Sequence, residues 1–140
     1  SVSMSVIDYN EFKKPSWYAI RNAFAPRTLM VKNTNDQLSV WYINDLDKLK
    51  NQEVHCKLVK TNGTLVKEWK ALVDFKENTA GLVIDLKTTR KEIGDGSHYL
   101  KVWVGNDETI NHYYYTAADM KLMKIIPSKL TATIKHVDDE

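Results

Sequence analysis

The sequence predicts an all-β fold, namely an immunoglobulin-like antiparallel β-sandwich preceded by one short N-terminal helix. First, apolar and polar residues alternate in about seven short segments between residues 28 and 116. Second, clusters of Asn, Asp and Gly separate these segments, as turns separate strands. Third, helical spacing of apolar residues is confined to the N-terminal part. Short strands separated by turn residues are typical of two packed antiparallel sheets.

The predicted helix begins at Pro15 and ends before Pro26. A proline suits the first helical turn, where its missing N–H leaves no hydrogen bond unmade, and a second proline stops the helix. Trp17, Ile20 and Phe24 recur at helical spacing and share one face. A helix this short is marginal in isolation, so this face needs a partner surface. We expect these three residues to dock on a preceding domain, or on the end of the sandwich.

Each strand is predicted from residues that share one face of a sheet through two-residue spacing. In chain order, these residues are Leu29 and Val31; Leu38, Val40 and Tyr42; Val54, Cys56 and Leu58; Trp69, Ala71, Val73 and Phe75; Leu82, Ile84 and Leu86; and His98, Leu100, Val102 and Val104. A last strand, rich in aromatics, is predicted from Ile110 to Thr116. Asn62-Gly63 predicts a hairpin with a type I′ turn, which needs positive φ at both central positions.

The two ends of the chain leave this pattern. We expect residues 1–26 to be the end of a preceding domain, so that the chain is a piece of a larger protein. Residues 27–118 form the predicted sandwich. Residues 119–140 contain a linker, followed by an alternating segment at 129–137. That segment is either an extra strand of this sandwich or the first strand of a following domain.

Composition argues against several classes of partner. The 140 residues carry a net charge of only +2, so no nucleic-acid or membrane partner is expected. Cys56 is the only cysteine, so no internal disulfide can form, and its position predicts a small buried core residue. The four histidines lack metal-ligand spacing. We therefore predict no cofactor and no metal.

Three aromatic residues are predicted on outer sheet surfaces. Trp41, Tyr99 and Trp103 lie opposite the aliphatic residues of their strands. Large exposed rings often mark interaction surfaces. They could stack on the apolar faces of sugar rings, or they could be buried against a neighbouring domain.

Three segments together resemble one enzyme family. They are SVIDY at residues 5–9, KPSWYA at residues 14–19 and AFAP at residues 23–26. This combination is similar to the end of the catalytic barrel in β-mannosidase-like hydrolases of glycoside hydrolase family 2. The resemblance implies that residues 1–26 are the strand, loop and helix that close that barrel. It implies that residues 27–118 are the immunoglobulin-like domain that follows.

The same resemblance places both catalytic glutamates upstream, so this chain is expected to contain no catalytic residue. A retaining glycosidase needs two carboxylates about 5.5 Å apart. Asp8 and Glu11 are the only acids near the barrel-like segment, and a lone acid beside a tyrosine usually fixes a loop. The resemblance also implies a glycoside hydrolase parent that is periplasmic or secreted. Its implied partners are the catalytic barrel and a C-terminal domain of the same polypeptide.

We therefore expect a non-catalytic accessory domain that supports the barrel and spaces the C-terminal domains. The first alternative is a carbohydrate-binding module that uses Trp41 and Trp103 as a platform, with an oligosaccharide as its partner. The second alternative is a cell-surface adhesion sandwich unrelated to hydrolases.

Overall fold

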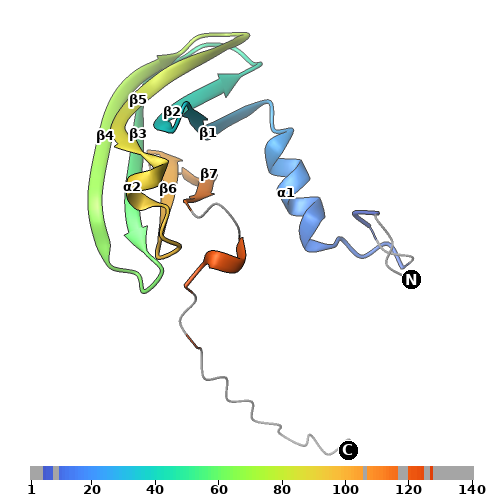
Figure 1. The fold of residues 1–140 in the computed structure, drawn as a ribbon. Coiled ribbons are helices and arrows are strands. Elements are labelled where there is room, and N and C mark those ends of the chain that lie inside the picture. Colours follow the sequence, from blue (N-terminus) through green and yellow to red (C-terminus); the bar gives the residue numbers. More distant parts are fainter. Residues whose placement is uncertain (1–4, 8–9, 106, 117–119, 125–126, 128–140) are drawn as a thin grey trace, which may run out of the picture.

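The computed structural model describes residues 5–7, 10–105, 107–116, 120–124 and 127. They form two antiparallel sheets that pack face to face, with a helix standing outside them (Figure 1). The strand orders are β1-β2-β5 in a three-stranded sheet and β4-β3-β6-β7 in a four-stranded sheet. The predicted immunoglobulin-like sandwich is confirmed. In chain order the elements are α1 (Pro15–Ala23), β1 (Arg27–Thr34), β2 (Gln37–Asn44), β3 (Leu49–Lys60), β4 (Leu65–Phe75), β5 (Thr79–Thr89), α2 (Arg90–Ile93), β6 (His98–Val104), β7 (Asp107–Tyr115) and the 3₁₀ turn η1 (Met120–Leu122).

The alternation along the strands builds the core between the sheets. The predicted core residues of β1, β2, β3 and β6 are buried, apart from a partly exposed histidine at the start of β6: Leu29, Val31, Leu38, Val40, Tyr42, Val54, Cys56, Leu58, Leu100, Val102 and Val104. Phe75 of β4 joins them, and Trp69, Ala71 and Val73 are partly buried against the same core. Burial raises the pKa of the Cys56 thiol to about 12, because the thiolate would lose its hydration. The predicted core role of Cys56 is confirmed.

Leu82 is an exception among the predicted core residues. It is 52% exposed, whereas Ile84 and Leu86 on the same strand are buried. The pairing of β2 with β5 shifts between Val40↔Ile84 and Trp41↔Leu82. Such a β-bulge reverses the parity of the strand, which places Leu82 opposite Trp41 on the outer face. The prediction is wrong for Leu82 because alternation does not reveal a bulge.

The predicted hairpin joins β3 to β4, but its turn differs from the prediction. Gly63 N donates to Lys60 O at 2.8 Å, and Lys60 N donates to Thr64 O at 2.9 Å. Gly63 has a φ of 86°, whereas the φ of Asn62 is not positive. A type I′ turn needs positive φ at both positions, so this loop is a type I turn followed by a left-handed glycine. The Asn-Gly pair is therefore also compatible with a three-residue hairpin loop.

The short helix α2 is absent from the sequence prediction. Thr89 Oγ1 accepts a hydrogen bond from Glu92 N at 3.2 Å, and Glu92 Oε2 accepts one from Thr89 N at 2.7 Å. This reciprocal pair is a capping box, which satisfies two donors at the helix start. Thr-x-x-Glu is visible in the sequence and could have revealed the helix. Four residues, however, are too few to show helical periodicity.

The loop after α2 holds the segment that follows β7. Gly96 has a φ of 84°, and a Cβ there would clash with the carbonyl oxygen of Leu122. Lys124 N donates to Gly96 O at 2.8 Å, and Lys124 Nζ lies 3.6 Å from Asp95 Oδ2. Hydrogen bonds from Ser97, aided by the Lys124 charge, hold the pKa of Asp95 below its ordinary value. Residues 122–124 are thus fixed to the sandwich as the chain leaves it.

Two predicted segments are reduced or lie outside the described residues. The short N-terminal strand is represented by one isolated bridge between Ile7 and Lys13. Asp8 and the alternating segment 129–137 lie outside the described part of the chain. Within the described part, no helix is long and apolar enough to cross a bilayer.

Candidate functional site

Helix α1 presents an apolar face that the sandwich does not cover. None of the residues of α1 is buried. Ile20 is 43% exposed, and Phe24, the C-cap, is 83% exposed. Trp17 is partly covered, since Lys13 Nζ and the Arg21 guanidinium lie 4.3 Å and 5.4 Å from its ring centroid. The three residues predicted to dock therefore share a surface that is open to a partner.

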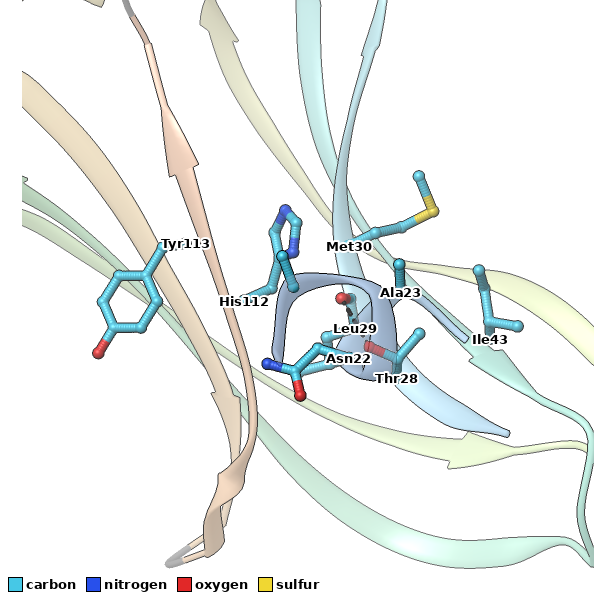
Figure 2. A pocket seen from close by; sticks show the side chains of 9 residues that line it. Asn22, Ala23, Thr28, Leu29, Met30, Ile43, His112 and Tyr113 are labelled. Atoms are coloured by element: carbon cyan, nitrogen blue, oxygen red, sulfur yellow. Dashed lines mark hydrogen bonds between the residues drawn. The ribbon is translucent and has the colours of Figure 1, made fainter. Parts of the chain in front are cut away.

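The opposite face of α1 carries small residues and borders a cavity of about 510 Å³ (Figure 2). The lining residues are Ala19, Asn22 and Ala23 of α1, with Thr28, Leu29, Met30, Ile43, His112 and Tyr113 of the sandwich. With 3.6 residues per turn, Ala19 and Asn22 lie across the helix from Trp17 and Phe24. The apolar face of α1 consequently points away from the sandwich. The expected alternative, docking of this face on the end of the sandwich, is wrong.

His112 stands in the wall of this cavity, and burial lowers its pKa below the ordinary value of 6.5. The imidazole of His112 therefore binds a proton more readily in the unfolded chain than in the folded chain. The contribution of neutral His112 to the free energy of unfolding is fully present above about pH 6.5 and decreases as the pH falls below that value. We predict that the urea concentration at the midpoint of unfolding decreases as the pH is lowered from about 7.5 to about 5. A His112→Gln variant should show a smaller fall, and an identical pH profile in both proteins would contradict this assignment.

The predicted outer aromatic residues lie on two different sheets. Trp41 is flanked on β2 by the buried Val40 and Tyr42, so it faces outward from the three-stranded sheet. Tyr99 and Trp103 occupy outward positions on β6 in the four-stranded sheet. Because the two sheets pack through their inner faces, Trp41 and Trp103 lie on opposite surfaces of the sandwich. A single platform built from both tryptophans is therefore wrong.

Trp103 contacts three neighbouring side chains on the outer face of its sheet. The His55 ring stacks on the indole, with 4.9 Å between centroids and an interplanar angle of 6°. Lys57 Nζ and Lys101 Nζ lie 5.4 Å and 5.2 Å from the indole centroid. Both distances suit cation–π attraction. One face of the Trp103 indole is thus occupied by the chain itself.

Trp41 is covered in a simpler way. Lys32 Nζ lies 4.7 Å from its ring centroid, and its indole Nε1 donates to Ser39 Oγ at 2.9 Å. The aliphatic part of a lysine can cover an apolar ring while its ammonium stays in water. This local cover explains how both tryptophans are accommodated on outer faces.

The described residues contain no cluster of metal-ligating side chains. None of their His, Cys, Asp and Glu side chains gather in groups of three that could hold a metal ion. Glu11 is exposed. His98 Nδ1 lies 3.0 Å from Asp95 Oδ1, so this histidine has a hydrogen-bond partner in the turn before β6.

Comparisons with known proteins fit this architecture. A family model described as a mannosidase Ig/CBM-like domain matches residues 36–121. The crystal structure of a β-D-mannosidase from Dictyoglomus thermophilum is similar, with a TM-score of 0.64 and 22% identity. That likeness covers 86% of this chain and 15% of the mannosidase, so the chain spans a small part of its length. A β-glucuronidase from Bacteroides uniformis gives a TM-score of 0.32 and 14% identity over 64% of this chain and 13% of that one, too low to indicate a shared fold. None of the curated proteins matches this chain.

Proposed function

Because the matched residues 36–121 are more than half of it, this chain belongs to the mannosidase Ig/CBM-like domain family, and we propose that it is an accessory domain of a β-mannosidase-like glycoside hydrolase. The parent enzyme is assigned to glycoside hydrolase family 2. The domain contributes no catalytic residue. It supports the catalytic barrel of the same polypeptide and spaces the domains that follow. Membership of this family favours a hydrolase parent over the alternative of a cell-surface adhesion protein.

The observation that carries this proposal is the uncovered apolar face of α1. A helix of nine residues is marginal without tertiary packing, and α1 has no buried residue in the sandwich. Ile20 and Phe24 expose apolar area that a covering surface would remove from water. Full burial would contribute roughly 1.5–3 kcal/mol for each side chain. In the proposed parent, the barrel supplies that surface.

The proposed role in spacing the following domain is supported by the loop between α2 and β6. Gly96 admits the Leu122 carbonyl where a side chain would clash, and it accepts a hydrogen bond from Lys124 N. These contacts fix Leu122 and Lys124 against the sandwich, and in the proposed parent they would restrict the placement of a following domain more than a free linker would.

Substitution on α1 in the intact parent enzyme tests the docking. An Ile20→Lys/Phe24→Lys double variant should weaken docking by roughly 3–6 kcal/mol, since two apolar side chains lose their burial. We expect the calorimetric midpoint of the barrel to fall. The same double substitution should change the stability of the isolated chain by less than about 0.5 kcal/mol, because both positions are exposed there.

The matched control is Leu72→Lys on β4. Leu72 is 68% exposed on the outer face of the four-stranded sheet, remote in the chain from α1. This variant should leave the barrel midpoint unchanged. The proposal fails if the α1 variant leaves the midpoint unchanged, or if the control lowers it equally.

A further inference from the structure

The tip of the hairpin between β3 and β4 carries a pair of residues whose chemistry the proposed function does not use. Asn62 is the only asparagine in the sequence that a glycine follows. Asn62, Gly63 and Thr64 are all exposed. An asparagine side chain can react with the backbone nitrogen of the next residue, and a glycine at that position offers the least steric hindrance. This tip shares no residue with α1, so its chemistry does not depend on the function proposed above.

The geometry of the tip prepares the Asn62 carboxamide for nucleophilic attack. Thr64 N donates a hydrogen bond to Asn62 Oδ1 at 3.0 Å. This donor withdraws electron density from Cγ, and it stabilises the negative charge that develops on Oδ1 when a nucleophile adds to Cγ. A side chain at Gly63 would find no atom of a non-adjacent residue within 4 Å of its Cβ, so the space around this backbone is open. The electrophile and the access to it are therefore both in place.

A second hydrogen bond restrains the nucleophile. Gly63 N donates to Lys60 O at 2.8 Å, and this bond holds the amide proton that the reaction must remove. Attack therefore requires a brief opening of the turn. An exposed hairpin tip opens at a low cost in free energy, because little apolar surface is uncovered. The folded chain should consequently react, but more slowly than the unfolded chain.

We propose that Asn62 is a site of spontaneous conversion to aspartate and isoaspartate. Gly63 N gives up its proton to hydroxide and attacks Asn62 Cγ. The bond from Gly63 N to Cγ forms, the Cγ–Nδ2 bond breaks, and Nδ2 leaves as ammonia after taking a proton from water. Water then opens the resulting cyclic imide at either of its two carbonyl carbons. One opening gives aspartate, and the other gives isoaspartate, whose main chain runs through Cγ; no atom is oxidised or reduced.

Peptide mapping by mass spectrometry tests this assignment on the 140-residue chain, incubated at neutral and at alkaline pH. Asn78 is the internal reference: it is also exposed in a turn, but it is followed by Thr79, whose branched side chain hinders attack. Asn62 should convert faster than Asn78 by on the order of tenfold or more. The rate should rise with pH, because hydroxide removes the amide proton. Conversion of Asn62 no faster than that of Asn78 would overturn the proposal, as would aspartate formed without isoaspartate.

Two comparisons separate the role of the residue pair from that of the turn. In urea, where the turn is absent, Gly63→Ala should slow the conversion of Asn62 by on the order of tenfold, because the added methyl group hinders access to the backbone nitrogen. The original chain should convert faster in urea than in buffer, since the bond from Gly63 N to Lys60 O is lost. An unchanged rate in Gly63→Ala would contradict attack by the Gly63 nitrogen. Equal rates in urea and in buffer would contradict the opening of the turn.

Discussion

Replacing Asn44 with aspartate is expected to lower the free energy of unfolding by about 3–5 kcal/mol. Asn44 is fully buried, and its Nδ2 donates to the carbonyl oxygens of Leu46, Asp47 and Lys76 at 3.0–3.1 Å. Its Oδ1 accepts from Arg27 Nε at 3.0 Å. An aspartate keeps the shape but cannot donate when ionised, so an anion would face three carbonyl oxygens. Urea denaturation at neutral pH measures the loss.

Asn78→Asp is the matched control for this substitution. Asn78 is exposed in the turn between β4 and β5, with a φ of 46° that Asn and Asp both tolerate. The free energy of unfolding of the Asn78→Asp variant should differ from that of the original chain by less than about 0.5 kcal/mol. The Asn44→Asp loss should shrink in acid, because the protonated carboxyl can donate again. A loss at Asn44 no larger than at Asn78 would show that the buried network contributes little.

Phe75→Ala is expected to cost about 3–5 kcal/mol of stability. Phe75 is fully buried at the end of β4, and its ring stacks on Tyr42 with 4.6 Å between centroids and an interplanar angle of 12°. Truncation removes the apolar contact between the two sheets and leaves a cavity that neighbouring side chains fill only in part. Chemical denaturation of the isolated chain measures the change.

The same strand provides the control. Leu72→Ala, at a position 68% exposed, should change stability by less than about 0.5 kcal/mol. Similar losses at Phe75 and Leu72 would mean that the sheets do not pack through the core described above. A small loss at both would point to the same conclusion.

Alternation of apolar residues was sufficient to predict most of the core, since a strand with one buried face must repeat every two residues. It was insufficient where the pairing is irregular. Leu82 changes face because of a bulge, and a bulge depends on the partner strand. The turn at Asn62-Gly63 likewise depends on loop length, which the dipeptide does not determine.

The candidate sites were predictable to different extents. Spacing alone placed Trp17, Ile20 and Phe24 on one helical face, because that face follows from the helical repeat. The relation between Trp41 and Trp103 was beyond sequence reasoning, since parity gives an outer face without giving the sheet. The stacking of His55 on Trp103 also required the register of β3 with β6, which strand alternation does not give.

Hydrogen–deuterium exchange of the backbone amides of α1 tests the docking of this helix most directly. It would be measured on the isolated chain and on the intact parent polypeptide. In the isolated chain, α1 should exchange at rates near those of an unfolded segment, because none of its residues is buried. In the parent, the same amides should be protected by on the order of a hundredfold or more, while Val54 and Cys56 in β3 stay equally protected in both. Equal exchange of α1 in the two samples would contradict docking on a catalytic barrel.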